Sequence, residues 1–85
     1  SNTIINTGAI VEHDCIIENH AHIATGARLC GNVHVGERSH IGAGATVLQN
    51  IRIGSRVIVG AGSVVLHNID DDSIVAGVPA KQISK

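Results

Sequence analysis

The chain has 85 residues, of which 44% are hydrophobic and none is Phe, Trp, Tyr or Met. This length leaves room for one domain, and the lack of aromatic rings indicates a narrow interior filled by aliphatic side chains. A formal net charge of −1 at pH 7 provides no basic field for nucleic acid, and no stretch is suited to insertion in a membrane. Two cysteines are too few for a disulfide framework, so we expect free thiols in the reducing cytoplasm.

From residue 5 onward the sequence repeats every six residues. A large aliphatic residue stands at every sixth position without exception: Ile5, Val11, Ile17, Ile23, Leu29, Val35, Ile41, Val47, Ile53, Val59 and Val65. Four residues after each of them comes a second, mostly small residue. A strict period of this length indicates a parallel β-helix, a solenoid whose coils stack around an aliphatic column. The sequence therefore predicts an all-β fold with its functional groups on the outside.

Hexapeptide repeats resemble those of the left-handed parallel β-helix, in which three repeats make one coil. Residues 5–70 would then form three to four coils, and residues 18 positions apart would stack in columns at the spacing of neighbouring strands. One column is made only of glycine: Gly8, Gly26, Gly44 and Gly62. Because glycine adopts a positive φ without penalty, this column predicts a tight corner lined by small residues. Such a corner is required by the turn itself, and it would also offer a smooth wall to a long thin ligand.

The three aspartates at residues 70–72 are expected to break the register. Residues 71–85 then form a closing segment, whose aliphatic stretch from Ile74 to Lys81 is expected to cover one end of the solenoid. The whole chain, residues 1–85, is thus predicted to be a single domain. The first coil has no evident cap, which suggests that another domain precedes it in a longer protein.

Six histidines are many for a chain of this length, and the coil geometry separates them. His22 and His40 share one column on a flat side and are expected to point outward. His13 lies at a corner beside Asp14, and Gly31, one coil above, leaves space over its imidazole. A neighbouring carboxylate can orient an imidazole and increase its basicity. A backbone N–H one strand away would complete the elements of acyl-transfer catalysis, although a solvated surface pair has the same sequence pattern.

At these residues the sequence resembles a particular enzyme family. The resemblance covers nearly the whole chain and is carried by residues 5–15, Ala21–Ile23, Cys30–Val33 and Gly77–Lys81. These segments are similar to the sialic acid O-acetyltransferase family, which includes bacterial amino-sugar N-acetyltransferases of glycan biosynthesis. The resemblance implies a left-handed β-helix and an acetyltransferase that takes its acetyl group from acetyl-CoA.

The resemblance also implies roles for individual residues. The histidine that matches His13 is the family's general base, and the acidic residue that matches Asp14 increases its basicity; some relatives have glutamate there. The resemblance implies contacts with acetyl-CoA for His22, Gly31, Ala43 and Ala61, and the charge of Lys81 adds that residue to the expected set. In this set His22 would act through its side chain and the glycine and alanines through main-chain groups. Lys81 is a candidate contact for the CoA phosphates.

The family resemblance further implies a homotrimer with its active site between protomers. The geometry gives a reason, because His13 and the corner that holds Ala43 and Ala61 lie on different edges of the prism, about 15 Å apart at the rise of a strand. A neighbouring prism could close a site that one prism leaves open. Family members usually carry an N-terminal Rossmann-like domain for the nucleotide-sugar, which we expect to be missing here. The expected acceptor is an amine or hydroxyl of a sugar or nucleotide-sugar.

Two other classes of function remain open on the sequence. Zinc enzymes of the γ-carbonic anhydrase type share this prism, but they need a close histidine pair on one chain and a third histidine from a neighbour. His34 and His40 are six residues apart and fall on different faces, so no metal is expected. A non-catalytic solenoid is the third hypothesis. Its ice-binding form needs a regular array of threonines, and only Thr7 and Thr25 share a column here.

Overall fold

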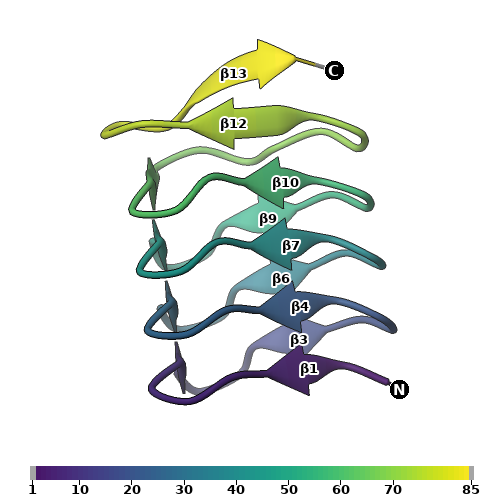
Figure 1. Cartoon of the computed structure of the whole chain (residues 1–85). Coiled ribbons are helices and arrows are strands. Elements are labelled where there is room, and N and C mark those ends of the chain that lie inside the picture. Colours follow the sequence, from purple (N-terminus) through teal and green to yellow (C-terminus); the bar gives the residue numbers. More distant parts are fainter. Residues whose placement is uncertain (1, 85) are drawn as a thin grey trace.

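The computed structural model describes residues 2–84, and every regular element in that range is a β-strand. Short strands joined by tight turns wind into a prism with three flat faces, which runs from β1 at one end to β13 at the other (Figure 1). The predicted left-handed parallel β-helix is confirmed. None of the described residues belongs to a helix that could cross a membrane.

Each face is made of parallel strands from successive coils. The first face contains β1 (Ile4–Ile5), β4 (His22–Ile23), β7 (His40–Ile41), β10 (Ile58–Val59) and β12 (Ile74–Ala76). The second face contains β2 (Ile10–Val11), β5 (Arg28–Leu29), β8 (Thr46–Val47) and β11 (Val64–Val65). The third face contains β3 (Ile16–Ile17), β6 (His34–Val35) and β9 (Arg52–Ile53). As far as Val65, residues 18 apart are in register on all three faces, as the period predicts.

Three corners join the faces, and we name them by their residues. The glycine corner, between the first and second faces, consists of residues 7–8, 25–26, 43–44 and 61–62. The His13 corner, between the second and third faces, consists of residues 13–14, 31–32 and 49–50. The basic corner, between the third and first faces, consists of residues 19–20, 37–38 and 55–56. The second residue of each turn has a positive φ, which glycine provides at one corner and mostly Asn, Asp, His or Arg at the others.

The aliphatic column predicted by the repeat forms the core. Ile23, Ile41 and Val59 stack on one another across the first face and are 0% exposed. Small residues such as Ala45 fill the remaining space, which explains why rings would not fit. The column is less well covered in the first coil, where Ile5 is 50% exposed because no described coil lies beneath it.

The register changes earlier than the aspartates, which corrects the expectation that residues 70–72 break it. Val65 still pairs 18 residues back with Val47, whereas Ile69 pairs 16 residues back with Ile53. The turn between them is therefore two residues shorter than the others, and Ile69 enters the large aliphatic column instead of a small inward position. The side-chain Oδ1 of Asn68 accepts the backbone N–H of Arg52 at 2.8 Å, in the place where a regular coil offers a carbonyl.

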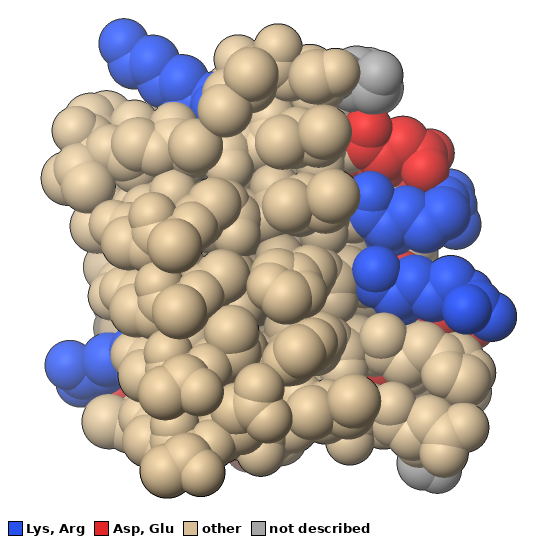
Figure 2. Space-filling view, viewed as in Figure 1, with Lys and Arg blue, Asp and Glu red and all other residues tan. Residues whose placement is uncertain are grey.

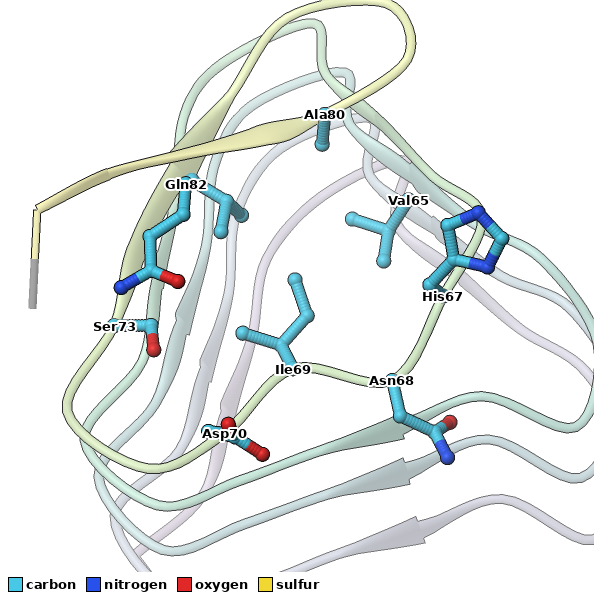
Figure 3. A pocket seen from close by; sticks show the side chains of 9 residues that line it. Val65, His67, Asn68, Ile69, Asp70, Ser73, Ala80 and Gln82 are labelled. Carbon is cyan, nitrogen blue, oxygen red and sulfur yellow. The ribbon is translucent and has the colours of Figure 1, made fainter.

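The closing segment also differs from the expectation, because its first part continues the solenoid. β12 (Ile74–Ala76) is the next strand of the first face, and only the chain after Gly77 turns back, as β13 (Lys81–Ser84), antiparallel to β12. The backbone N–H of Ala80 donates to Val64 O at 2.8 Å, and Ala80 packs against the core. A cavity of about 120 Å³ remains at this end, between Ala80, Val65 and Ile69 (Figure 3).

Candidate active site

His13 is placed by the turn of the His13 corner, where Asp14 takes a φ of 60°. This conformation directs the two side chains toward each other, and His13 Nδ1 lies 3.2 Å from Asp14 Oδ2. Both side chains are largely exposed, at 80% and 81%. With Nδ1 facing the carboxylate, Nε2 remains available to exchange a proton with a molecule that approaches the corner.

Gly31 lies one coil above His13 and is buried. A Cβ at this position would lie 2.9 Å from both Cε1 and Nε2 of His13, so the imidazole itself occupies the space that the glycine leaves. The sequence predicted an empty space over the imidazole, whereas in the structure the ring itself fills the space beside Gly31. The coils are linked here by the Asn32 N–H, which donates to His13 O at 2.9 Å. Within residues 2–84 the N–H of Gly31 makes no hydrogen bond, which leaves it as a donor near the imidazole.

His22 lies on the first face, in the column that also holds His40. The two rings are in contact, with centroids 4.6 Å apart and planes at 65°. The Nδ2 of Asn6 lies 2.8 Å from His22 Nε2, and an amide N–H that donates to this nitrogen leaves the proton of the neutral ring on Nδ1. Sequence reasoning missed Asn6. The only sequence feature that could have identified Asn6 is its position: it lies two residues after Ile4, which is directly below His22 in the same column.

His40 differs electrostatically from an exposed histidine. Burial lowers its pKa first, because a partly buried imidazole is hydrated less well when charged. The neighbouring His22 lowers the pKa of His40 further through like-charge repulsion. His40 is therefore biased toward the neutral form near neutral pH.

Ala43 and Ala61 lie on the exposed edge of the glycine corner. Ala43 O accepts the N–H of Gly62 at 2.8 Å, which links the two coils. The N–H groups of Ala43 and Ala61 form no hydrogen bond with any residue from 2 to 84, so both can serve an outside acceptor. A Cβ at Gly44 or Gly62 would meet nothing within 4 Å, so this edge is open to an extended ligand.

Lys81 begins β13 and is exposed at the end of the prism where the chain finishes its last coil. Its strand partner is Ala76, so it lies along the first face, beyond the column of His22 and His40. This places a flexible cation near the same end as Ala61 and far along the prism axis from His13. The arrangement suits an anionic group at the far end of a ligand that lies along the prism.

Apart from His22 and Lys81 on the first face, the structure places the predicted residues in two groups and leaves those groups apart. His13, Asp14 and Gly31 form one group at the His13 corner, while Ala43 and Ala61 lie on the glycine corner. The second face separates the two corners by roughly 15 Å of extended strand. One chain therefore presents the parts of a site on two edges, and the cavity of Figure 3 is lined by none of these residues.

Several other charged groups are paired on the surface. Figure 2 shows basic side chains gathered along one edge of the prism next to an acidic one. At this basic corner Arg56 donates to Asp72 at 2.6 Å, and this hydrogen bond raises the pKa of Arg56. On the second face, Arg28 pairs with Glu12 at 2.7 Å. Exposed pairs of this kind contribute little to stability, and they do not lie at the residues predicted to bind acetyl-CoA.

The histidines do not converge on a metal site within the chain. His34 pairs with Glu18 on the third face, apart from His40 on the first. His22 and His40 do form a close pair, which the sequence argument against zinc did not consider. However, residues 2–84 contain no group of three or more His, Cys, Asp or Glu side chains arranged to hold a metal ion.

The chain is similar to known proteins in both sequence and fold. The family model for bacterial transferase hexapeptide (six repeats) matches residues 32–67. GDP-perosamine N-acetyltransferase from Caulobacter crescentus, solved as a histidine-to-alanine variant with CoA and GDP-perosamine, is 43% identical with a TM-score of 0.96. That match covers 98% of this chain and 40% of the solved chain.

The acetyltransferase domain of PglB from Neisseria gonorrhoeae is 47% identical with a TM-score of 0.94, over 95% of this chain and 40% of that chain. It has also been solved in complex with acetyl coenzyme A. The chain thus spans about two fifths of the length of these solved proteins, at 40% in both matches. In its repeats, its prism and these two matches, the chain is similar to the bacterial transferases of the hexapeptide-repeat family.

Proposed function

We propose that this chain is the acetyl-CoA-dependent acetyltransferase domain of an enzyme that acetylates a nucleotide-linked sugar, with His13 as general base. The observation that carries the proposal is the contact of 3.2 Å between His13 Nδ1 and Asp14 Oδ2, with the imidazole seated against Gly31. The likeness to two acetyltransferases that bind CoA or acetyl-CoA supports the choice of donor.

The chemistry follows from the orientation of His13. Asp14 accepts the Nδ1–H, so the lone pair of Nε2 can take a proton from the acceptor amine or hydroxyl as it attacks the thioester carbon. The new C–N or C–O bond forms, and a tetrahedral oxyanion develops. A nearby N–H, such as that of Gly31, would stabilise this oxyanion. The C–S bond then breaks, and the proton held by His13 passes to the departing thiolate of CoA.

The donor would lie along the prism between the coils that hold His22 and Lys81. His22 would contact the acetyl end of acetyl-CoA through its Nδ1–H. The free N–H groups of Ala43 and Ala61 would pair with the amide carbonyls of the pantetheine arm, which is an extended chain suited to the open glycine corner. Lys81 would meet the phosphates by charge. The cofactor brings its own reactive thioester, and these residues only position it.

A homotrimer would join the two corners that one chain keeps apart. His13 of one protomer would face the glycine corner of the next, so the acceptor and the donor would meet in the cleft between them. The second face, which lies between these corners, carries exposed apolar side chains such as Ile10, at 53%, and Leu66, at 40%. Their burial against a neighbour would favour this assembly.

The same similarities support a proposal for the whole enzyme and its acceptor. The chain would be the C-terminal part of a protein similar to the sialic acid O-acetyltransferases and amino-sugar N-acetyltransferases, with a separate domain for the nucleotide. The acceptor would be a nucleotide-linked sugar, as GDP-perosamine is for the Caulobacter enzyme. Cys15 and Cys30 are free thiols, which is in keeping with the cytoplasm, where acetyl-CoA is also found.

Acetyl transfer and acetyl-CoA binding, measured on the same samples, test this proposal. Calorimetry should detect acetyl-CoA binding to the protein and to its His13→Ala variant with similar affinity. Steady-state transfer to nucleotide-linked amino sugars should fall by at least ~10²-fold in kcat in that variant, because it lacks the positioned base. Wild-type kcat in His13→Ala, or no acetyl-CoA binding at all, would contradict the proposal.

A further inference from the structure

The column of His22 on the first face contains one other ring. Its outward residues are Ile4, His22, His40, Ile58 and Ile74, in register from coil to coil. Aliphatic side chains are therefore accepted at this face, and nothing in the fold requires an aromatic ring at residue 40. The ring stands next to His22, with the two centroids 4.6 Å apart and an edge-to-face angle of 65°. This is a favourable geometry for two rings in contact.

His22 is thus held from two sides by residues of neighbouring coils. On the side of the coil below, Asn6 Nδ2 lies 2.8 Å from its Nε2. On the side of the coil above, the ring of His40 covers it. Asn6 selects which nitrogen carries the proton, but a single hydrogen bond leaves the ring able to rotate about it. The ring of His40 removes that freedom, because rotation would lose the packing contact.

We infer that His40 is a positioning residue, which fixes the His22 ring against Asn6 so that its Nδ1–H is held as a donor for acetyl-CoA. The role of the ring is geometric, and it acts through His22 without contact with the reacting atoms. This inference rests on the proposed function for its ligand, whereas the effect on His22 itself can be observed without any ligand. Burial and the neighbouring ring also lower the pKa of His40, which keeps positive charge on His40 away from His22 near neutral pH.

Two variants distinguish the effect of the His40 ring from the effect of its ionisation. His40→Ala removes the ring, and His40→Phe keeps a ring of similar shape without ionisable nitrogens. His67→Ala serves as a matched control, since His67 is an exposed histidine on a different part of the surface. Nitrogen-15 spectra of the imidazoles report which nitrogen of His22 carries its proton, and calorimetry on the same samples reports acetyl-CoA affinity.

We expect His22 of the wild type, of His40→Phe and of His67→Ala to give the spectrum of a single Nδ1–H form. In His40→Ala the signals should shift toward an exchanging mixture, and acetyl-CoA affinity should fall roughly three- to tenfold, which is the range of one aromatic contact. In steady-state transfer this loss should raise KM more than it lowers kcat. If His40→Ala does not fold, His40→Leu removes the ring while keeping an aliphatic side chain, as at Ile58.

An unchanged His22 spectrum in the variants without a ring would overturn the inference, whatever their affinity for acetyl-CoA. A His40→Phe variant as impaired as His40→Ala in both spectrum and affinity would also overturn it, because the ring would then not be the active feature. Failure of the wild type to bind acetyl-CoA would instead contradict the proposed function. The spectra would still decide whether His40 positions His22.

Discussion

The imidazole of His13 rests against Gly31, in the space that any side chain at residue 31 would need. A Cβ there would lie 2.9 Å from two atoms of the ring. The contact involves the exposed end of a side chain and not the backbone, so the ring can swing away without disturbing the coil. The glycine at this position therefore determines where the candidate base points, more than whether the chain folds.

Gly31→Ala tests this relationship. The variant should melt near the wild-type temperature, and its kcat for acetyl transfer should fall by about 10²-fold, because a displacement of roughly 1 Å misplaces the base. Gln49→Ala, one coil above in the same corner, is the control and should keep wild-type kcat. Circular dichroism during heating and steady-state kinetics check the two outcomes. Unchanged kcat in a folded Gly31→Ala variant would show that the orientation of His13 is unimportant.

Asp14→Asn separates the charge beside His13 from the shape of the turn. Asparagine tolerates the φ of 60° found at residue 14 and can still bond to His13 Nδ1, but it carries no charge. We expect kcat between that of the wild type and that of His13→Ala, with acetyl-CoA affinity unchanged. Steady-state kinetics beside calorimetry would show this order. A variant as slow as His13→Ala would mean that the carboxylate is needed outright.

His40 predicts the direction in which stability changes with pH. Its pKa lies below the ordinary 6.5, so the unfolded chain binds more protons than the folded one as the pH falls through that value. His40 therefore makes the folded chain less stable as the pH falls, and it has no such effect above neutrality. Urea unfolding midpoints between about pH 8 and pH 5 would measure it, and His40→Phe should show a flatter slope. Equal slopes would refute the assignment.

Much of the fold can be predicted from the six-residue repeat, because each coil has the same turns and the same inward positions. The six-residue spacing predicted the column from Ile23 to Val59, the glycine corner and the neighbouring positions of His13, Asp14 and Gly31. It could not predict the contact of Asn6 with His22, since this diagonal hydrogen bond depends on side-chain conformations and not on register.

The shortened turn before Ile69 illustrates a different limit. Ile69 and Val75 keep the six-residue spacing between themselves but are offset from Val65, and a single offset in sequence does not say where the turn contracts. The structure shows that a side chain takes part at the shortened turn, where Asn68 accepts the N–H of Arg52. The six-residue repeat cannot reveal that a polar side chain replaces a backbone carbonyl as hydrogen-bond acceptor.

Asn68→Ala tests the importance of that replacement. The variant leaves the Arg52 N–H without its protein partner, so we expect a loss of about 1 kcal/mol in the free energy of unfolding. Asn68→Asp keeps an acceptor at the same place and should lose less, and Gln49→Ala is an exposed control without such a bond. Urea denaturation of the three variants would rank them. A neutral Asn68→Ala would mean that water satisfies the N–H equally well.

The proposed trimer predicts complementation between two inactive variants. His13→Ala removes the base from one corner, and Ala61→Trp blocks the glycine corner, so a site that draws one corner from each of two neighbours stays intact in some mixed trimers. After joint unfolding and refolding of equal amounts, random mixing should restore roughly a quarter of the wild-type sites. Each variant refolded alone should stay inactive, and light scattering should give a mass near three times 8.8 kDa. Because a site contained in one chain cannot be repaired by a neighbour, a mixture no more active than its parts would place both corners in the same protomer's site.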